Sequence, residues 1–316
     1  MQITLLESLG VPESTLERLT APLIEKGHSF TACKNSPFDA EIIEQAKDAD
    51  VIVLANKRLS GEVIRALDRL QFISVAFTGV DHVDLAACRE KGIALSNAAG
   101  YATDSVAELT VCMMLTLLRR VLEADERTRE CGTRDGIIGN ELRGKTVGIV
   151  GTGAIGLQVA RLCLVFGCRV IASAPHPKKE AVEMGVTYVP LDELMAQADL
   201  ITLHVPLNDE TRGMIDGRRI GLMKPTACLI NMARGPVVDN AALALALKRG
   251  TVAGAAVDVY DKEPPLYPGH PLLGAPNTVC TPHIAFATKE SMEKRAQIAF
   301  ENVAVWLEGR QINKVL

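Results

Sequence analysis

Short apolar runs rich in β-branched residues alternate with longer segments of helical periodicity along most of this chain. Such alternation is typical of α/β folds, because each crossover helix returns the chain to the same edge of a parallel sheet. The runs form two series, and a length of 316 residues exceeds what one hydrophobic core usually supports. The sequence therefore predicts an α/β protein with two doubly wound domains.

The predicted strands of the first series occupy residues 3–6, 30–33, 51–54, 72–77 and 93–96, and those of the second series occupy 146–150, 169–173, 200–204, 227–231, 253–258 and 278–281. Between the two series, residues 104–129 keep a helical pattern without a breaker, which predicts one helix of about 26 residues. This helix would link the domains, and it is either a packing surface between subunits or an ordinary buried helix. A last helix is predicted over 289–308.

Composition and charge exclude several classes of function. The 34 Lys+Arg and 38 Asp+Glu leave a formal charge of −4, so no general field would attract nucleic acid or an anionic membrane. The 8 cysteines include no C-x-x-C pair, which favours reduced thiols over disulfides or a metal centre. No segment approaches the ~20 apolar residues of a membrane span, and the N-terminus lacks the basic region of a leader. We expect a cytoplasmic protein that uses no metal and binds neither nucleic acid nor membrane.

The most specific local motif is TVGIVGTGAIG at residues 146–156, where a strand pattern leads into glycines. Gly151, Gly153 and Gly156 match the dinucleotide fingerprint G-x-G-x-x-G. In that fingerprint the first glycine permits a tight turn, the second lets the backbone approach a pyrophosphate, and the third lets helix and strand pack closely. A helix that starts at Ala154 would present free N–H groups to the phosphates. The motif predicts a site for NAD or NADP.

The next strand lacks the acidic residue that NAD sites usually carry at its end. About twenty residues beyond the glycine loop, such sites place Asp or Glu against the ribose hydroxyls, whereas this chain has Ala174. The missing carboxylate removes a repulsion against a 2′-phosphate, and Ser173, His176 and Lys178 are polar neighbours in sequence. NADP is therefore favoured. The alternative is an NAD enzyme in which Lys178 and Lys179 lie in a solvated turn.

Reactive side chains follow three further strands of the second series. Arg234 follows one strand, Asp258 and Glu263 follow the next, and His283 follows the last. Carboxyl ends of parallel strands meet at one edge of the sheet, so these groups should lie beside the glycine loop. Taken singly, each has an ordinary explanation as a helix cap, a turn residue or a loop histidine. Their shared edge favours a functional site.

This set of side chains suffices for hydride transfer between a ketone and an alcohol. A guanidinium binds a carboxylate in bidentate fashion and polarises the adjacent carbonyl. An imidazole gives a proton to the forming alkoxide, and a nearby carboxylate favours its protonated form. The hydride would come from a nicotinamide, and no metal is required.

Five motifs resemble those of the D-isomer-specific 2-hydroxyacid dehydrogenase family: GTGAIG at 151–156, LHVP at 203–206, NMARG at 231–235, AVDVYDKEP at 256–264 and TPHI at 281–284. The resemblance covers nearly the whole chain. It implies a Rossmann dinucleotide-binding domain at 99–284, a discontinuous flavodoxin-like substrate domain at 1–98 and 285–316, and a homodimer. It also implies that Arg234 binds the substrate carboxylate and carbonyl, that His283 is the acid/base, and that Glu263 pairs with it.

The same resemblance implies further contacts in both domains. Besides the glycines, the cofactor would contact Ala154, Ile155, His204, Val205, Pro206, Met232, Ala233, Asp258 and Ala285. The segments LANKRL at 54–59 and FTGVDHVD at 77–84 match the two substrate loops of the family, which implies substrate contacts from Asn56, Lys57, Thr78, Gly79 and Val80. The turn at 78–80 would offer N–H groups to a carboxylate; otherwise it simply ends a strand.

The leading interpretation is an NAD(P)-dependent reductase that converts a small 2-keto acid to the D-2-hydroxy acid. Asn56 and Lys57 resemble residues of hydroxypyruvate or glyoxylate reductases, so these keto acids come first. Larger aliphatic 2-keto acids are an alternative. A second alternative is a binding protein of the same fold that senses dinucleotides without catalysis.

Overall fold

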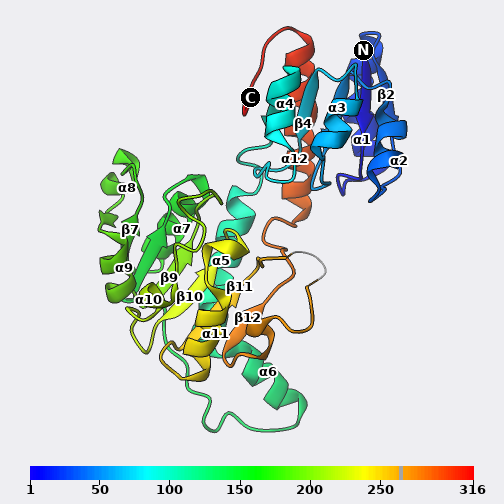
Figure 1. Cartoon of the computed structure of the whole chain (residues 1–316). Helices are drawn as coiled ribbons and strands as arrows, with labels where there is room; N and C mark the ends of the chain where they lie inside the picture. The colour runs from blue at the N-terminus through cyan, green and yellow to red at the C-terminus, as the bar shows by residue number, and fades with distance from the viewer. Residues whose placement is uncertain (263–265) are drawn as a thin grey trace. The chain divides into compact units, whose positions relative to one another are not determined.

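A computed structural model describes residues 1–262 and 266–316, which form two compact units. One unit consists of Met1–Ala102 and Ala287–Leu316, and the other of Thr103–Phe286. These limits lie close to residues 98 and 284, where the sequence divides the chain. Each unit is built on a parallel sheet with helices (Figure 1), which confirms the predicted α/β fold class.

The sheet of the discontinuous unit has five parallel strands in the order β2-β1-β3-β4-β5. Its strands are β1 (Gln2–Leu5), β2 (Ser29–Ala32), β3 (Val51–Leu54), β4 (Phe72–Val75) and β5 (Ala94–Asn97). This order is flavodoxin-like and has its topological switch between β1 and β3. β3 and β4 are buried at every residue, which explains why their sequences are continuous apolar runs rather than alternating ones.

The helices of this unit are α1 (Glu13–Glu25), α2 (Asp39–Ala46), α3 (Gly61–Ala66), α4 (Leu85–Lys91) and α12 (Lys289–Leu307). α12 returns from the C-terminal part of the chain and packs on α1 and on β3, β4 and β5. Buried polar contacts fix it there: Ser74 Oγ donates to the Ala299 carbonyl (2.8 Å), and Asn302 Nδ2 donates to the Asn97 carbonyl (2.9 Å). Trp306 stacks on Phe72 with ring centroids 4.9 Å apart.

The other unit has a seven-stranded parallel sheet in the order β12-β11-β10-β9-β6-β7-β8. Its strands are β6 (Thr146–Val150), β7 (Arg169–Ser173), β8 (Thr187–Tyr188), β9 (Leu200–Leu203), β10 (Cys228–Asn231), β11 (Gly254–Val257) and β12 (Thr278–Cys280). The strand order reverses at β6 and β9, which is the switch point where ligands of such sheets bind. The sequence does not predict β8, whose two residues are too short to show a periodicity.

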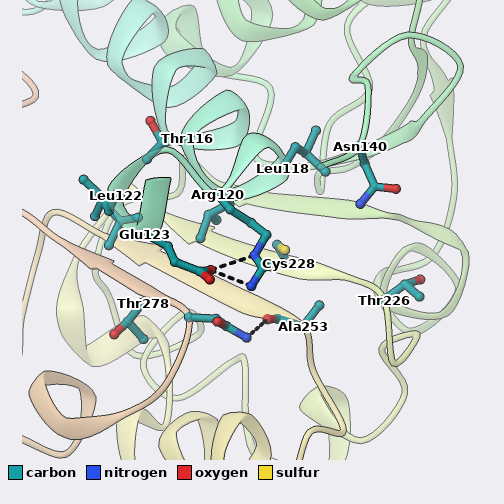
Figure 2. A pocket seen from close by; sticks show the side chains of 13 residues that line it. Thr116, Leu118, Arg120, Leu122, Glu123, Asn140, Thr226, Cys228, Ala253 and Thr278 are labelled. Carbon is teal, nitrogen blue, oxygen red and sulfur yellow. Dashed lines mark hydrogen bonds and ion pairs between the residues drawn. The ribbon is translucent and has the colours of Figure 1, made fainter. Parts of the chain in front are cut away.

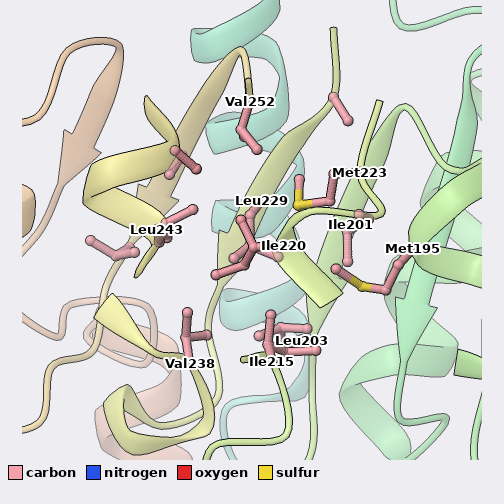
Figure 3. Packing of buried hydrophobic residues seen from close by; sticks show 14 of the residues in the cluster. Met195, Ile201, Leu203, Ile215, Ile220, Met223, Leu229, Val238, Leu243 and Val252 are labelled. Carbon is pink, nitrogen blue, oxygen red and sulfur yellow. The ribbon is translucent and has the colours of Figure 1, made fainter. Parts of the chain in front are cut away.

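A large apolar cluster joins the strands of this sheet to the helices that pack on it. Helices α9 (Leu191–Gln197), α10 (Gly217–Ile220) and α11 (Asn240–Lys248) contribute Met195, Ile220 and Leu243, which pack with Ile201 and Leu229 of the strands (Figure 3). Helices α5 (Thr103–Arg119) and α7 (Ala154–Val165) pack against each other, and the short α8 (Lys179–Glu183) follows β7. Among the described residues, no helix is both long and apolar enough to cross a membrane.

The prediction of one continuous helix over 104–129 is wrong. The segment forms α5 and a separate α6 (Val121–Arg129), because Arg120 adopts a left-handed conformation with φ 52°. The Arg120 guanidinium is held by the Glu123 carboxylate (Nε to Oε2, 2.7 Å) and by the Gly136 carbonyl (2.8 Å). The Asn140 N–H donates to the Leu118 carbonyl (2.8 Å), which satisfies the end of α5. Gly136 and Asn140 are distant in sequence from the end of α5, so no local breaker marks the break.

Candidate functional site

The glycine loop forms an open cradle between β6 and the start of α7. A Cβ on Gly156 would lie 2.0 Å from the Gly151 carbonyl oxygen, and one on Gly151 would lie 2.6 Å from the His204 carbonyl oxygen. Both glycines are therefore required for close packing, and Gly151 also has a φ of +93°. At Gly153 a Cβ would meet no atom within 4 Å. The cradle thus leaves space directly at the N-terminus of α7, which fits a dinucleotide pyrophosphate.

The loop after β9 adds a neutral histidine beside this cradle. His204 Nε2 lies 2.9 Å from Thr202 Oγ1, while its Nδ1 is buried without a hydrogen-bond partner. Burial lowers the pKa of His204 to about 3, so the ring is uncharged at neutral pH. Val205 is half-buried and Pro206 is exposed. An orphaned polar atom at this edge is consistent with a polar ligand that completes it.

The loop after β7 is fastened to the glycine loop by one tyrosine. The Tyr188 hydroxyl donates to Thr152 Oγ1 (2.9 Å) and accepts from the Lys178 N–H (3.1 Å). Ser173 and Ala174 are half-buried, whereas His176 and Lys178 are exposed. The bond from Lys178 therefore holds this polar turn close to the cradle, at the end of a strand that carries no acidic residue.

Arg234 follows β10 in a segment that its neighbours fix closely. Asn231 Oδ1 accepts from the Ala233 N–H (3.0 Å), and Asn231 Nδ2 donates to the Arg234 carbonyl (3.0 Å). The next residue is Gly235, where a Cβ would lie only 1.9 Å from the carbonyl carbon of Tyr260. The Arg234 segment thus lies directly against the segment that follows β11. Glu263, which the sequence singles out farther along that segment, lies outside the described residues.

Asp258 is fully buried at the end of β11 and accepts three hydrogen bonds. Its Oδ1 accepts from Thr281 Oγ1 (2.6 Å) and from the Ile284 N–H (2.8 Å), and its Oδ2 accepts from the Ala285 N–H (2.8 Å). Burial raises the pKa of Asp258, and these hydrogen bonds oppose the rise. All three donors belong to the loop after β12, so this carboxylate holds that loop in place.

His283 lies in the middle of the loop that Asp258 holds. Its backbone is left-handed, with φ 55°, which is uncommon for a residue other than glycine. The ring is half-buried and meets Phe286 edge-on at 5.4 Å. Beside it is a largely apolar cavity of about 200 Å³, lined among others by Tyr260, Leu266 and Pro282. The hydrogen bonds on either side of His283 support the strained backbone and project the imidazole at the carboxyl edge of the sheet.

The five expected substrate residues belong to the other unit, at the carboxyl edge of its own sheet. Glu7 Oε1 accepts from the N–H groups of Ala55 (2.9 Å) and Lys57 (2.5 Å), which fixes the loop after β3. Lys57 is buried and its ammonium donates to the Ser36 carbonyl, while Asn56 is exposed. After β4, Thr78 is exposed and Gly79 and Val80 are half-buried.

A separate cavity of about 260 Å³ lies in the unit of Thr103–Phe286, at the opposite end of its strands (Figure 2). Its lining includes Thr226, Ala253 and Asn277, which precede β10, β11 and β12. Arg120 and Glu123 are paired with each other there, and Asn277 Nδ2 donates to the Ala253 carbonyl (3.1 Å). Ligands of open α/β sheets bind at the carboxyl ends of the strands, so this cavity is not the candidate site.

The loops at the carboxyl edge of this sheet carry polar groups of several kinds. Among residues 1–262 and 266–316, no group of three or more His, Cys, Asp or Glu is arranged to hold a metal ion. The edge instead offers an anion cradle, a guanidinium and an imidazole, all on loops of one parallel sheet.

Known proteins are similar to this chain over the segments that form the candidate site. The family model described as "D-isomer specific 2-hydroxyacid dehydrogenase, NAD binding domain" matches residues 111–285. A glyoxylate reductase of Thermofilum pendens is 39% identical over 282 residues, which are 86% of this chain and 83% of the relative.

Two solved structures share the fold of the whole chain. An acyclic imino acid reductase in complex with NADPH and D-Arg has a TM-score of 0.90 at 28% identity and full coverage of both chains. The D-lactate dehydrogenase of Aquifex aeolicus, complexed with NAD and lactic acid, has a TM-score of 0.85 at 31% identity, covering 98% of this chain and 96% of that one.

The glycine cradle gives a prediction with a matched control. Gly153→Ala should leave folding intact, because its Cβ meets open space, but should weaken NAD(P)H binding by about tenfold or more, because the methyl group occupies the space for the pyrophosphate. Gly156→Ala should instead lower the free energy of unfolding by about 2–4 kcal/mol through its backbone clash. Fluorescence titration with NAD(P)H and urea denaturation measure the two effects. Unchanged binding in a folded Gly153→Ala variant would contradict this assignment of the cradle.

Proposed function

This chain belongs to the D-isomer specific 2-hydroxyacid dehydrogenase family, and on that premise we propose that it reduces hydroxypyruvate to the D-2-hydroxy acid glycerate, or glyoxylate to the achiral glycolate. It is an NAD(P)-dependent D-2-hydroxyacid dehydrogenase that acts as a 2-keto acid reductase. The observation that carries the proposal is the convergence of the glycine cradle, Arg234 and His283 at the carboxyl ends of one parallel sheet. The T. pendens relative, a glyoxylate reductase, supports the choice of a small keto acid.

In this proposal each residue has a role that its chemistry supports. Arg234 binds the substrate carboxylate with its planar guanidinium and polarises the adjacent carbonyl. His283 donates a proton to the carbonyl oxygen as it becomes a hydroxyl, and Glu263 pairs with the imidazolium. The bound nicotinamide supplies the hydride. Asp258 keeps the loop of His283 in position through its three hydrogen bonds.

The cofactor and the substrate have further proposed contacts on loops of the two units. The cofactor contacts are the cradle with Ala154 and Ile155, the loop His204, Val205 and Pro206, and the backbone of Met232, Ala233 and Ala285. For the substrate, the turn Thr78–Gly79–Val80 offers N–H groups to its carboxylate, and the exposed Asn56 reaches it directly. Lys57 supports the loop, because its ammonium is bonded to Ser36.

The acid/base role is tested by His283→Ala in a panel assay. Turnover should fall by ~10²–10⁴-fold, the usual contribution of a general acid, while NAD(P)H binding stays within about twofold of wild type. Oxidation of NAD(P)H at 340 nm with hydroxypyruvate, glyoxylate, pyruvate and 4-methyl-2-oxopentanoate also ranks the substrates. His28→Ala, in the other unit, serves as control. Near-normal turnover of His283→Ala would remove this residue from the chemistry, and a wild-type protein inactive with all four acids would refute the proposed substrate class.

For the cofactor we propose a preference for NADP over NAD. Ala174 places no carboxylate just beyond the end of β7, and the polar residues Ser173, His176 and Lys178 are its neighbours in sequence. Tyr188 supports this arrangement because it ties the Lys178 backbone to the glycine loop. Of the two similar solved structures, one is described with NADPH and the other with NAD. The proposed preference therefore rests on the residues of this chain.

Ala174→Asp tests this preference. The introduced carboxylate should bind the ribose hydroxyls of NADH and repel the 2′-phosphate of NADPH. The ratio of kcat/KM for NADPH to that for NADH should therefore fall by about tenfold or more. Val182→Asp on the exposed face of α8 adds the same charge nearby and should leave the ratio unchanged. A wild-type protein that strongly prefers NADH would overturn the proposal.

We also propose that two copies of the chain associate through α5 and α7. A largely apolar hollow of about 500 Å³ is lined by Val111, Cys112, Leu115, Leu162 and Phe166. Beside it, Val165 is 82% exposed at the end of α7, and contiguous exposed apolar surface marks interaction sites. Glu108, in the N-terminal half of α5, and Arg119, at its C-terminal end, have opposite charges, which suits antiparallel pairing of two α5 helices about a twofold axis.

Val165→Glu combined with Phe166→Glu should convert this dimer to a single chain of 33.9 kDa, because two buried carboxylates per subunit would lose their hydration. Light scattering after size exclusion measures the mass. Leu245→Glu on α11 changes a residue that is 47% exposed outside the patch and should leave the mass unchanged. A wild-type mass of one chain would contradict the homodimer.

A further inference from the structure

Arg295 is a buried cation on α12 that the proposed chemistry does not use. Its residue exposure is 4%, although arginine is almost never buried without partners. The guanidinium donates twice to the carbonyl of Leu9, from Nε (3.2 Å) and from a terminal nitrogen (2.7 Å). Leu9 lies in the loop after β1, so this contact ties α12 to the carboxyl edge of the five-stranded sheet.

Two further loops of the same edge meet this guanidinium. Its central carbon lies 5.3 Å from the centre of the Phe77 ring, within the range of a cation–π contact. It also makes a hydrogen bond to the side chain of Tyr101. Phe77 follows β4 and Tyr101 follows β5, and their rings lie 5.7 Å apart. One buried group therefore contacts the loops after β1, β4 and β5.

The contact with Phe77 bears on the turn that follows it. Thr78, Gly79 and Val80 are the next residues, and Asn97 Nδ2 donates to the Thr78 carbonyl (2.8 Å). The Ala98 N–H donates to the Phe77 carbonyl (2.9 Å). The turn is thus attached on one side to the loop after β5 and at its base to the Phe77 ring, which packs under Arg295.

We propose that Arg295 is a positioning residue that sets the Thr78–Val80 turn, and hence the N–H groups that receive the substrate carboxylate, by holding Phe77, Tyr101 and Leu9 together. The substrate part of this inference rests on the proposed function. The positioning part concerns the turn alone. The residue acts through Phe77 and Tyr101 and transfers no proton itself.

The charge of Arg295 is suited to this task. Burial lowers the pKa of Arg295, and the Tyr101 side chain and the Glu7 carboxylate oppose this shift. Glu7 is the residue that also fixes the backbone of the loop after β3 through Ala55 and Lys57. Replacing the guanidinium with an apolar group would leave the Leu9 carbonyl without its donors and Phe77 without its cation.

The test compares Arg295→Met, Arg295→Lys and Tyr101→Phe in the full-length protein. Hydrogen exchange of the peptide that contains Thr78–Val80 should become about tenfold faster in Arg295→Met, and less so in Arg295→Lys, which keeps the charge. The KM for the keto acid should rise about tenfold in Arg295→Met and by a smaller factor in the other two variants, with kcat and the Kd for NAD(P)H nearly unchanged. Arg18→Met, which breaks an exposed ion pair between α1 and Glu293 of α12, is the control and should change neither quantity.

The two readouts separate the possible failures. If wild type reduces keto acids but exchange and KM stay unchanged in folded Arg295→Met, the positioning role is refuted while the proposed function stands. If exchange accelerates but no keto acid is turned over by wild type, the turn is positioned as inferred and the proposed function fails. If KM rises while kcat and the affinity for NAD(P)H both fall, the variant is generally destabilised, and this result would also overturn the inference. If Arg295→Met does not fold, Arg295→Lys and Tyr101→Phe decide by the same criteria.

Discussion

The buried carboxylate of Asp258 carries the constraint on which the candidate site depends. A parallel sheet brings the ends of its strands to one edge but does not determine how the loops beyond them are held. Asp258 holds the loop of His283 in one arrangement, because its two oxygens accept three hydrogen bonds from residues on both sides of the histidine. A left-handed backbone at a non-glycine residue persists only where the surroundings hold it in place. The position of the imidazole is therefore determined by a group at the end of the neighbouring strand.

Glycines at the same edge of the sheet allow neighbouring backbone segments to pack closely against each other. Gly156 allows α7 to start directly against Gly151, and Gly235 allows the segment of Arg234 to lie on the backbone of Tyr260. In both cases a single methyl group would meet a main-chain atom at about 2 Å, which no side-chain rotation relieves. The cradle, the guanidinium and the segment after β11 are thus positioned by contacts in which the absence of a side chain is the essential feature.

Much of this arrangement was predictable, because it depends on short-range patterns. The β6 and β7 strands begin and end at the predicted residues, since their apolar runs are bounded by polar or glycine residues. The loops that carry Gly151, Ala174, Arg234, Asp258 and His283 follow from the strand ends. The break at Arg120 was not predictable, because the Gly136 carbonyl that binds Arg120 and the Asn140 N–H that binds the Leu118 carbonyl belong to a loop that folds back on the end of α5. The three donors to Asp258 were missed for the same reason: the sequence shows an acid near a strand end, but it does not show which N–H groups face it.

In each of the two sheets a single buried charge holds the loops at the carboxyl edge, and the two charges have opposite signs. In the seven-stranded sheet a buried anion, Asp258, collects N–H and O–H donors from one loop. In the five-stranded sheet a buried cation, Arg295, contacts a carbonyl, an aromatic ring and a hydroxyl from three loops. Burying a charge is costly, and a well-packed apolar group is often at least as stabilising. At both positions the partners of the buried charge come from specific loops, so the charge favours the arrangement that brings those partners together. The net charge of −4 therefore says little about the ligand, because the charges that bear on the site are single local groups: Arg234 beside the proposed substrate, and the buried charges that hold the loops.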